Sequence, residues 1–97
     1  MKAQGTLKAK MDIQRVSDRF QKREFVVTLK RENTCHVEEL PPEHVSFQLQ
    51  QDNCSIINDI IVGSEVEVEF DLKGRMWDGP QGIKYFNTLE AVSVQKI

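Results

Sequence analysis

One strictly alternating segment, residues 65–72, constrains the fold of this chain more than any other. Apolar side chains occupy every second position, and acidic side chains fill the positions between them. Successive side chains of a β-strand point to opposite faces, so the pattern predicts a half-buried strand with one acidic face. The apolar set is Val66, Val68, Phe70 and Leu72, and the acidic set is Glu65, Glu67, Glu69 and Asp71.

Four further segments have the period of a strand: residues 5–13, 22–30, 44–50 and 84–94. In the last of them Leu89 and Ala91 are two apart, and Val94 follows three later. This slip in phase predicts a β-bulge near Val92 and Ser93. The side chains expected to point inward from the first three are Leu7, Ala9, Met11, Ile13, Phe25, Val27, Leu29, Val45, Phe47 and Leu49.

The segments between these strands are polar or contain turn-forming residues. Residues 14–21 lack core periodicity and predict an exposed loop. Residues 74–82 predict a glycine-rich loop, which begins where Gly74 ends the acidic strand. Residues 32–43 end in Pro41-Pro42, which is typical of a connection. Residues 52–61 predict one or two turns of helix, since isoleucines recur there with i, i+3, i+4 spacing: Ile56, Ile57, Ile60 and Ile61.

Five short strands with a small helix between the third and the fourth are the element order of an OB-fold, a five-stranded Greek-key barrel. A chain of 97 residues has room for one such domain, so we expect a single all-β (mainly β) domain over residues 1–97. OB-folds bind oligonucleotides across strands 2 and 3 and the loops that join strands 1 and 2 and strands 4 and 5. In this chain those loops are residues 14–21 and 74–82.

The charges are segregated along the chain although the net charge is only −2. Nine of the 13 Lys and Arg residues lie within residues 1–31. Residues 32–72 contain ten acidic residues and no Lys or Arg. The acidic block covers the third and fourth predicted strands, whereas cations gather near the two predicted loops. The sequence therefore predicts a molecule with one basic and one acidic surface.

Cationic and aromatic side chains near the two loops are the candidate binding residues, because cations neutralise phosphates and aromatic rings stack on bases. Phe20 is either a stacking platform or a plug over the end of the sheet, and Trp77 either stacks on a base or caps the core. Lys8, Lys10 and Arg15 are expected to be surface residues whose reversal leaves the fold intact. The candidates are Lys8, Lys10, Arg15, Arg19, Phe20, Lys22, Arg23, Arg75, Trp77, Lys84 and Tyr85.

Motifs for catalysis or metal binding are missing from the sequence, which has no nucleophile elbow, phosphate loop or metal-ligand pair. No zinc site is expected, because the spacing of Cys35, His36, His44 and Cys54 matches no common set of ligands. The two cysteines are therefore expected to be ordinary reduced thiols. We therefore expect a non-enzymatic protein with no cofactor, metal or small-molecule substrate. The chain has no apolar run of membrane-spanning length and begins without a signal peptide, so we expect no membrane association and a cytoplasmic location.

Three motifs carry a family resemblance: Val62-Gly63-x-Glu65-Val66, Gly74-Arg75-x-Trp77 and Tyr85-Phe86-Asn87-Thr88-Leu89-x-Ala91. With them the chain resembles a family of small uncharacterised bacterial and phage domains, which are regarded as OB-folds similar to single-stranded DNA-binding proteins. The resemblance covers most of the chain, residues 5–94. It implies single-stranded DNA binding through Arg75, Trp77 and Tyr85.

Two functional hypotheses from different classes follow. The first is a binder of single-stranded DNA with little sequence preference and a role in DNA replication, with RNA as the alternative ligand because the same contacts serve both. The second is an OB-fold module for protein–protein interaction, whose acidic face docks a basic partner or organises a homo-oligomer. A homo-oligomer is also expected under the first hypothesis, since so small a domain needs a partner to build a long binding track. The acidic face is most simply explained as a solvated surface that discourages edge-to-edge aggregation.

Overall fold

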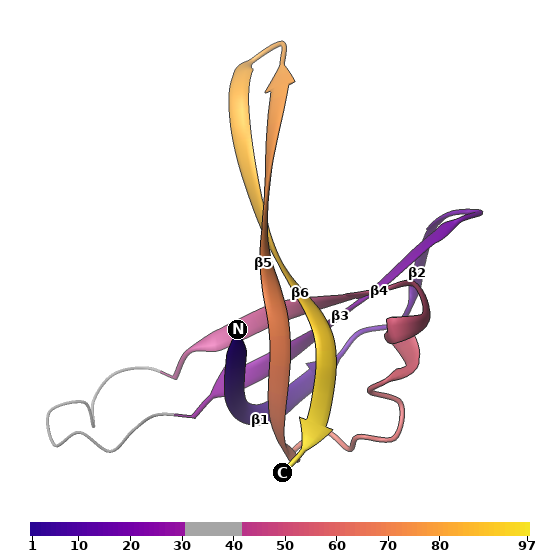
Figure 1. Cartoon of the computed structure of the whole chain (residues 1–97), viewed down its shortest axis with the longest axis vertical. Coiled ribbons are helices and arrows are strands. Elements are labelled where there is room, and N and C mark those ends of the chain that lie inside the picture. Colours follow the sequence, from indigo (N-terminus) through magenta and orange to yellow (C-terminus); the bar gives the residue numbers. More distant parts are fainter. Residues whose placement is uncertain (31–41) are drawn as a thin grey trace, which may run out of the picture.

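The computed structural model describes residues 1–30 and 42–97. Six strands and one short 3-10 helix form this described part (Figure 1). Most of the connection predicted at residues 32–43, with Cys35 and His36, lies outside it. Within it, no helix is long and apolar enough to cross a membrane. The elements are β1 (Lys2–Lys10), β2 (Gln14–Ser17), β3 (Phe20–Leu29), β4 (His44–Gln50), the 3-10 helix η1 (Gln51–Ser55), β5 (Glu65–Gly79) and β6 (Gly82–Lys96).

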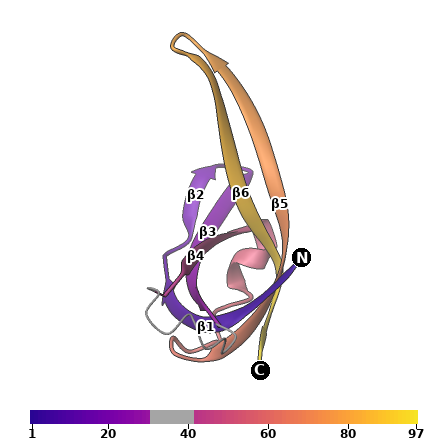
Figure 2. The same ribbon diagram turned by 90° about the vertical axis from the view of Figure 1, so that its left-hand side faces the viewer.

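Five of the strands close into a barrel. The hydrogen-bonded order is β1-β5-β6-β4-β3-β2, and an additional pairing of β1 with β3 joins the sheet into a ring. β2 pairs with the first part of β3 and lies outside this ring (Figure 2). The helix η1 lies between the third and fourth strands of the ring, β4 and β5. The predicted mainly-β OB-fold is therefore confirmed.

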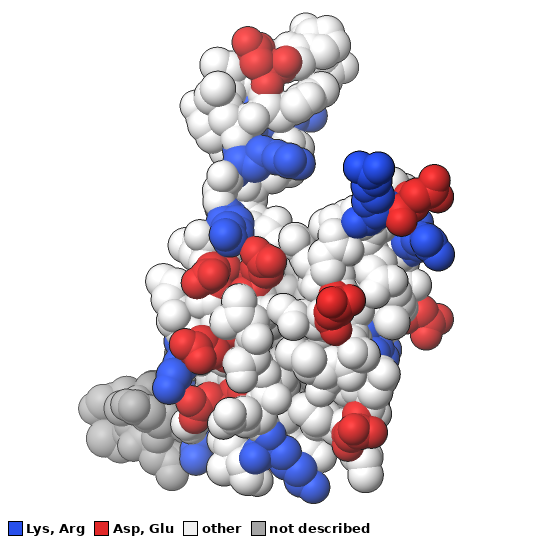
Figure 3. Space-filling view, turned by 45° about the vertical axis from the view of Figure 1, so that its right-hand side comes forward, with Lys and Arg blue, Asp and Glu red and all other residues white. Residues whose placement is uncertain are grey.

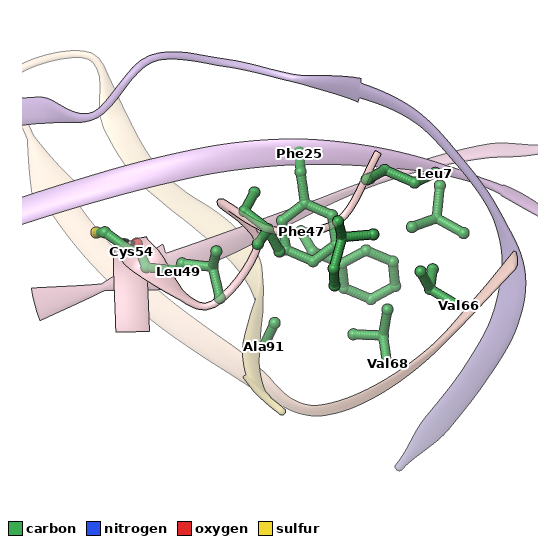
Figure 4. Close-up of a cluster of buried hydrophobic side chains, with 11 residues drawn as sticks. Leu7, Phe25, Phe47, Leu49, Cys54, Val66, Val68 and Ala91 are labelled. Carbon is green, nitrogen blue, oxygen red and sulfur yellow. Dashed lines mark hydrogen bonds between the residues drawn. The ribbon is translucent and has the colours of Figure 1, made fainter. Parts of the chain in front are cut away.

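The barrel is filled by apolar side chains, most of which the alternating pattern had placed inward (Figure 4). The ring of Phe47 is stacked with that of Phe25, with 5.5 Å between centroids, and meets Phe70 edge-on at 5.1 Å. Aromatic pairs in such geometries add about 0.5–1.5 kcal/mol beyond the burial of their surface. The buried residues of the core are Leu7, Phe25, Val27, Phe47, Leu49, Cys54, Ile57, Ile60, Val66, Val68 and Ala91.

The end of the first strand differs from its prediction. β1 ends at Lys10, and Met11 and Ile13, which were expected to point inward, are exposed. The ladder between β1 and β3 shifts register at Lys8, an extra residue in β1. Such a bulge reverses the alternation that follows it, and Lys10 is therefore the partner of buried Phe25. The prediction that Met11 and Ile13 belong to the core was wrong for this reason.

Both predicted loops are hairpins instead. Residues 14–21 form β2, a tight turn and the start of β3, whereas β5 continues through Gly74 as far as Gly79. Gly74 does not end the strand, because it stays paired in the ladder with Asn87 of β6. Residues 72–89 of β5 and β6 rise from the barrel as a two-stranded arm, which we call the ribbon (Figure 1).

The helix predicted at residues 52–61 is a 3-10 helix followed by turns. η1 ends at Ser55, and the Asn58 N–H then donates to the Ser55 carbonyl and the Ile60 N–H to that of Ile57. Residues three apart share a face in this geometry. Ile57 and Ile60 are accordingly buried, whereas Ile61, which the spacing grouped with them, is exposed.

The bulge predicted in the last strand is confirmed. Glu69 pairs with Ser93 and Phe70 with Ala91, so Val92 is the extra residue in β6. A bulge bends its strand and increases the local twist. The bend lies close to the position where β6 meets β4 and closes the ring.

Gly5 allows β1 and β3 to approach each other closely. A Cβ atom at this position would overlap the Thr28 carbonyl oxygen and lie 2.8 Å from Cγ1 of Val27. We expect Gly5→Ala to lower the free energy of unfolding by about 1–3 kcal/mol, because the backbone of β3 has to move. Urea denaturation followed by circular dichroism measures this loss.

Gly74→Ala is the matched control for this prediction. At Gly74 the nearest atom to an added Cβ is Oδ1 of Asn87, at 3.9 Å, which is ordinary van der Waals contact. The control should leave stability unchanged or slightly higher, since alanine has less freedom than glycine to lose on folding. Equal stabilities of the two variants would contradict the close approach at Gly5.

Candidate nucleic-acid interface

A groove of about 1020 Å³ lies between the ribbon and the β2–β3 hairpin and passes over the outer face of β4. Figure 3 shows the hollow between the two projections, with Lys and Arg side chains on both of them. The groove therefore joins the two segments that the sequence predicted as binding loops. Its lining includes the cations Lys22, Lys73 and Arg75 and the aromatic residues Phe20, Trp77 and Phe86.

The ribbon supplies one wall of the groove through the alternation of its ladder. Directly paired residues of an antiparallel ladder project to the same face. Arg75 is paired with Phe86, and Trp77 with Lys84, so cationic and aromatic side chains alternate on a single face of the ribbon. The side chains of Trp77 and Phe86 are half exposed, at 49% and 51%. They offer open aromatic surface, and the alternative that Trp77 caps the core is wrong.

The opposite face of the ribbon holds Tyr85, which the sequence grouped with Trp77. Tyr85 is paired with Met76, one step out of phase with Trp77, and it is 73% exposed. The structure therefore does not bring Tyr85 into the groove. It brings in Phe86 instead, which the sequence reasoning missed. Continuing the alternation of β5 through Gly74 and pairing it with β6 would have identified Phe86.

The β2–β3 hairpin supplies the facing wall with Phe20 and Lys22. Phe20 is partly buried at the first position of β3, and its side chain lines the groove. Two hydrogen bonds fix the hairpin to the start of η1: Nε2 of Gln21 donates to the Gln51 carbonyl at 3.0 Å, and Nε2 of Gln51 donates to the Arg19 carbonyl at 2.8 Å. The facing wall is thus held to the start of η1 through both the backbone and the side chain of one residue, Gln51.

The floor between the walls is polar and carries little net charge. Gln48 and Gln50 project from β4, with Nε2 of Gln50 donating to Oε1 of Gln48 at 2.8 Å. Glu90 is the acidic residue of the lining, and its carboxylate is paired with Nζ of Lys73 at 3.8 Å. The charge of Lys73 is thereby partly neutralised by Glu90, which leaves Lys22 and Arg75 as the other cations of the groove lining.

Two of the predicted binding residues make structural hydrogen bonds. Nζ of Lys10 donates to the carbonyl oxygens of Ile60 at 2.8 Å and Ile57 at 3.4 Å. Arg23 likewise holds the segment after β4 against the barrel. Its guanidinium donates to the Met11 carbonyl at 2.8 Å, the Cys54 carbonyl at 3.1 Å and Oδ1 of Asn58 at 2.6 Å. The prediction that Lys10 is a free surface residue was wrong, because the bulge at Lys8 turns its side chain toward these carbonyls.

The other predicted cations lie on the surface. Arg15 and Arg19 are exposed on the β2–β3 hairpin, and Lys84 is exposed on the ribbon face that carries Trp77. Lys8 is exposed on β1. Contact of these four residues with a nucleic acid stays a prediction.

The acidic residues of β5 lie on the same face of the strand as the groove wall. Glu65, Glu67, Glu69 and Asp71 alternate outward, and the same alternation continues through Lys73, Arg75 and Trp77. Glu67 is paired with Nζ of Lys2 at 3.6 Å and accepts a hydrogen bond from Gln4 at 3.0 Å. One face of one strand thus changes from acidic beside the barrel to basic and aromatic beside the groove.

Cys54 is a buried residue of the core. Its Sγ donates to the Leu49 carbonyl at 3.5 Å, and burial raises the pKa of the thiol above its usual value, so the protonated form is favoured. Over residues 1–30 and 42–97, no group of three or more His, Cys, Asp or Glu side chains is placed to hold a metal ion. Cys35 and His36, considered above as zinc ligands, lie outside these residues. Nδ1 of His44 is hydrogen-bonded to Oγ1 of Thr28 at 2.9 Å.

Removing the Lys10 ammonium should destabilise the fold. We expect Lys10→Ala to lower the free energy of unfolding by about 1–3 kcal/mol, because it leaves two carbonyl oxygens without a charged donor. Lys8→Ala, an exposed lysine of the same strand, is the control and should change stability by less than about 0.5 kcal/mol. Thermal denaturation of both variants measures the difference. Equal losses of stability would show that the Lys10 hydrogen bonds do not contribute to the stability of the fold.

Comparison with known proteins supports the fold. Residues 2–95 match a protein family described as Domain of unknown function (DUF3127). No curated protein matches the sequence. Among solved structures, the chain is similar to a deletion mutant of the single-stranded DNA binding protein from Thermus aquaticus, with 18% sequence identity and a TM-score of 0.66. The match covers 99% of this chain and 48% of that one, so this chain spans about half the length of the Thermus protein.

Proposed function

We propose that this chain, which belongs to the DUF3127 domain family, is a non-enzymatic protein that binds single-stranded DNA with little sequence preference. The observation that carries the proposal is the groove whose two walls present cations beside aromatic rings. The fold shared with the Thermus single-stranded DNA binding protein supports it. Protection of single strands during DNA replication in the cytoplasm is a cellular role that this activity fits.

The groove suits a single strand better than a duplex. Lys22 and Arg75, on facing walls, would neutralise phosphates, and the rings of Trp77, Phe86 and Phe20 would stack on bases. Base faces are available for stacking only when the bases are not already stacked within a helix. Every base has such a face, so these contacts carry little sequence preference.

The acidic residues beside the barrel would limit the path of the strand. Asp71 is paired with Glu90 in the ladder, at the position where the outer face of β5 changes sign. Phosphates are repelled by carboxylates, so a bound strand would follow the groove between the hairpins and avoid the acidic part of β5. RNA remains the alternative ligand, since phosphate neutralisation and stacking serve it equally.

Binding should weaken with salt and should favour single strands. If Lys22 and Arg75 neutralise two phosphates, the logarithm of the association constant should fall with the logarithm of salt concentration with a slope of about −1.4, because roughly 0.7 counterions are released per phosphate. Anisotropy titrations of matched single-stranded DNA, single-stranded RNA and duplex measure this. A slope near zero, or equal affinity for duplex, would overturn the proposal, and tighter RNA binding would favour the alternative.

The two aromatic residues on opposite faces of the ribbon should differ in effect. We expect Trp77→Ala to cost about 1–3 kcal/mol of single-stranded DNA binding, the usual range for stacking one base on one ring. Tyr85→Ala, a change of similar size on the other face, should cost clearly less. Affinities for a short oligonucleotide and the melting temperatures of both variants give the comparison. Equal losses at unchanged stability would place the nucleic acid on both faces.

The apolar face of the ribbon, defined by Leu72, Met76, Ile83 and Tyr85, is the surface we propose for the expected homo-oligomer. All four side chains are more than half exposed. A two-stranded ribbon is only marginally stable in water when its apolar face is uncovered. Asp78, near the tip, is the one charged residue on this face of the ribbon. The same face of a second copy could therefore cover the apolar residues without burying many charges.

Met76→Glu tests this surface. A charge at the centre of the apolar face should abolish self-association, because its burial against a second copy is costly. Light scattering after gel filtration measures the mass, and affinity for a short oligonucleotide should change little, since Met76 faces away from the groove. A parent protein that is monomeric at high concentration, or a variant that still associates, would contradict the proposed surface.

A further inference from the structure

The indole of Trp77 lies directly against the backbone of Gly79, two residues along the same face of β5. A Cβ atom at Gly79 would overlap three consecutive atoms of the six-membered ring: Cε3, Cζ3 and Cη2. Gly79 is correspondingly half-buried, whereas its neighbours Asp78 and Pro80 are exposed. The ring therefore occupies the space that any other residue at this position would fill.

The turn at the tip of the ribbon does not account for a glycine at this position. Among the described glycines, positive φ angles occur at Gly63 (100°) and Gly82 (109°), and Gly79 is not one of them. Gly82, its partner across the ladder, supplies the backbone conformation that disfavours other residues. The backbone of Gly79 would accept alanine, and the contact that an alanine side chain would displace is the one with the Trp77 ring.

We propose that Gly79 is a positioning residue for base stacking. Its missing side chain lets the indole lie on the ribbon backbone, in an orientation that presents the rest of the ring to the groove. A ring whose orientation is already fixed loses less conformational freedom when a base stacks on it. Packing of the indole on Gly79 therefore increases affinity through preorganisation. This inference rests on the proposed function, because stacking is the role assigned to Trp77.

Gly79→Ala is the test, and Trp77 as the single tryptophan of the chain reports on it. In the free protein, the variant should change the emission maximum of Trp77 and its quenching by acrylamide, because the ring is displaced from the backbone. Stacking on one ring corresponds to about 5- to 150-fold in affinity, and we expect the variant to lose at least the lower end of this range for single-stranded DNA.

Two controls separate positioning from a general effect on the ribbon. Gly74→Ala is the same change on the same strand, and it should leave the emission of Trp77 in the free protein unchanged. Gly79→Ala introduced into Trp77→Ala should not reduce affinity further, since there is no ring left to position.

The outcomes decide between this inference and its alternatives. Unchanged emission and affinity in Gly79→Ala, or an equal loss of affinity with and without Trp77, would overturn the positioning role. A parent protein that fails to bind single-stranded DNA would overturn the proposed function and the stacking role together. In that case the emission of Gly79→Ala would still show whether Gly79 seats the indole.

Discussion

The long antiparallel ladder between β5 and β6 is the interaction on which the rest of the structure depends. It runs from the pair Val66 and Lys96 in the barrel to the pair Gly79 and Gly82 at the tip of the ribbon. The same two strands therefore supply part of the core and one wall of the groove. Because β5 alternates without a bulge from Glu65 to Gly79, its side chains that face solvent beside the barrel are in phase with those that face the groove. The position of Trp77 is thus fixed by the same register that buries Val66 and Val68.

The alternating pattern predicted most of the fold, and it failed where a single residue changed the phase. Phe25, Phe47 and Val68 are buried as expected, and the bulge at Val92 left a visible slip in the last strand. The bulge at Lys8 left no such mark, because it lies within Lys8-Ala9-Lys10, where neither face is strongly apolar. The prediction that Gly74 ends the strand was wrong. Glycine is tolerated inside a strand at an exposed position, and the backbone of Gly74 stays paired with that of Asn87.

The candidate site was predicted in its location but only partly in its residues. Element order alone placed it between the first and the last hairpin, where the groove lies. Lys10 and Arg23 could not be told from binding cations, because their acceptors are mostly carbonyl oxygens 31–50 residues away in the sequence. The net charge of the chain likewise did not predict the groove. The cations of the groove come from two distant segments, and one of these cations, Lys73, is already paired with Glu90.

The ring of strands is closed between β4 and β6 by a parallel pairing with one residue pair, Gln48 and Glu90, and both residues line the groove. Closure of the barrel therefore joins segments far apart in the chain, and contacts of this kind slow folding because a long loop must first be closed. A strand lying in the groove would touch both sides of this seam. It would bridge the junction of the barrel that has only one residue pair. Binding in the groove would therefore raise the free energy needed to separate β4 from β6.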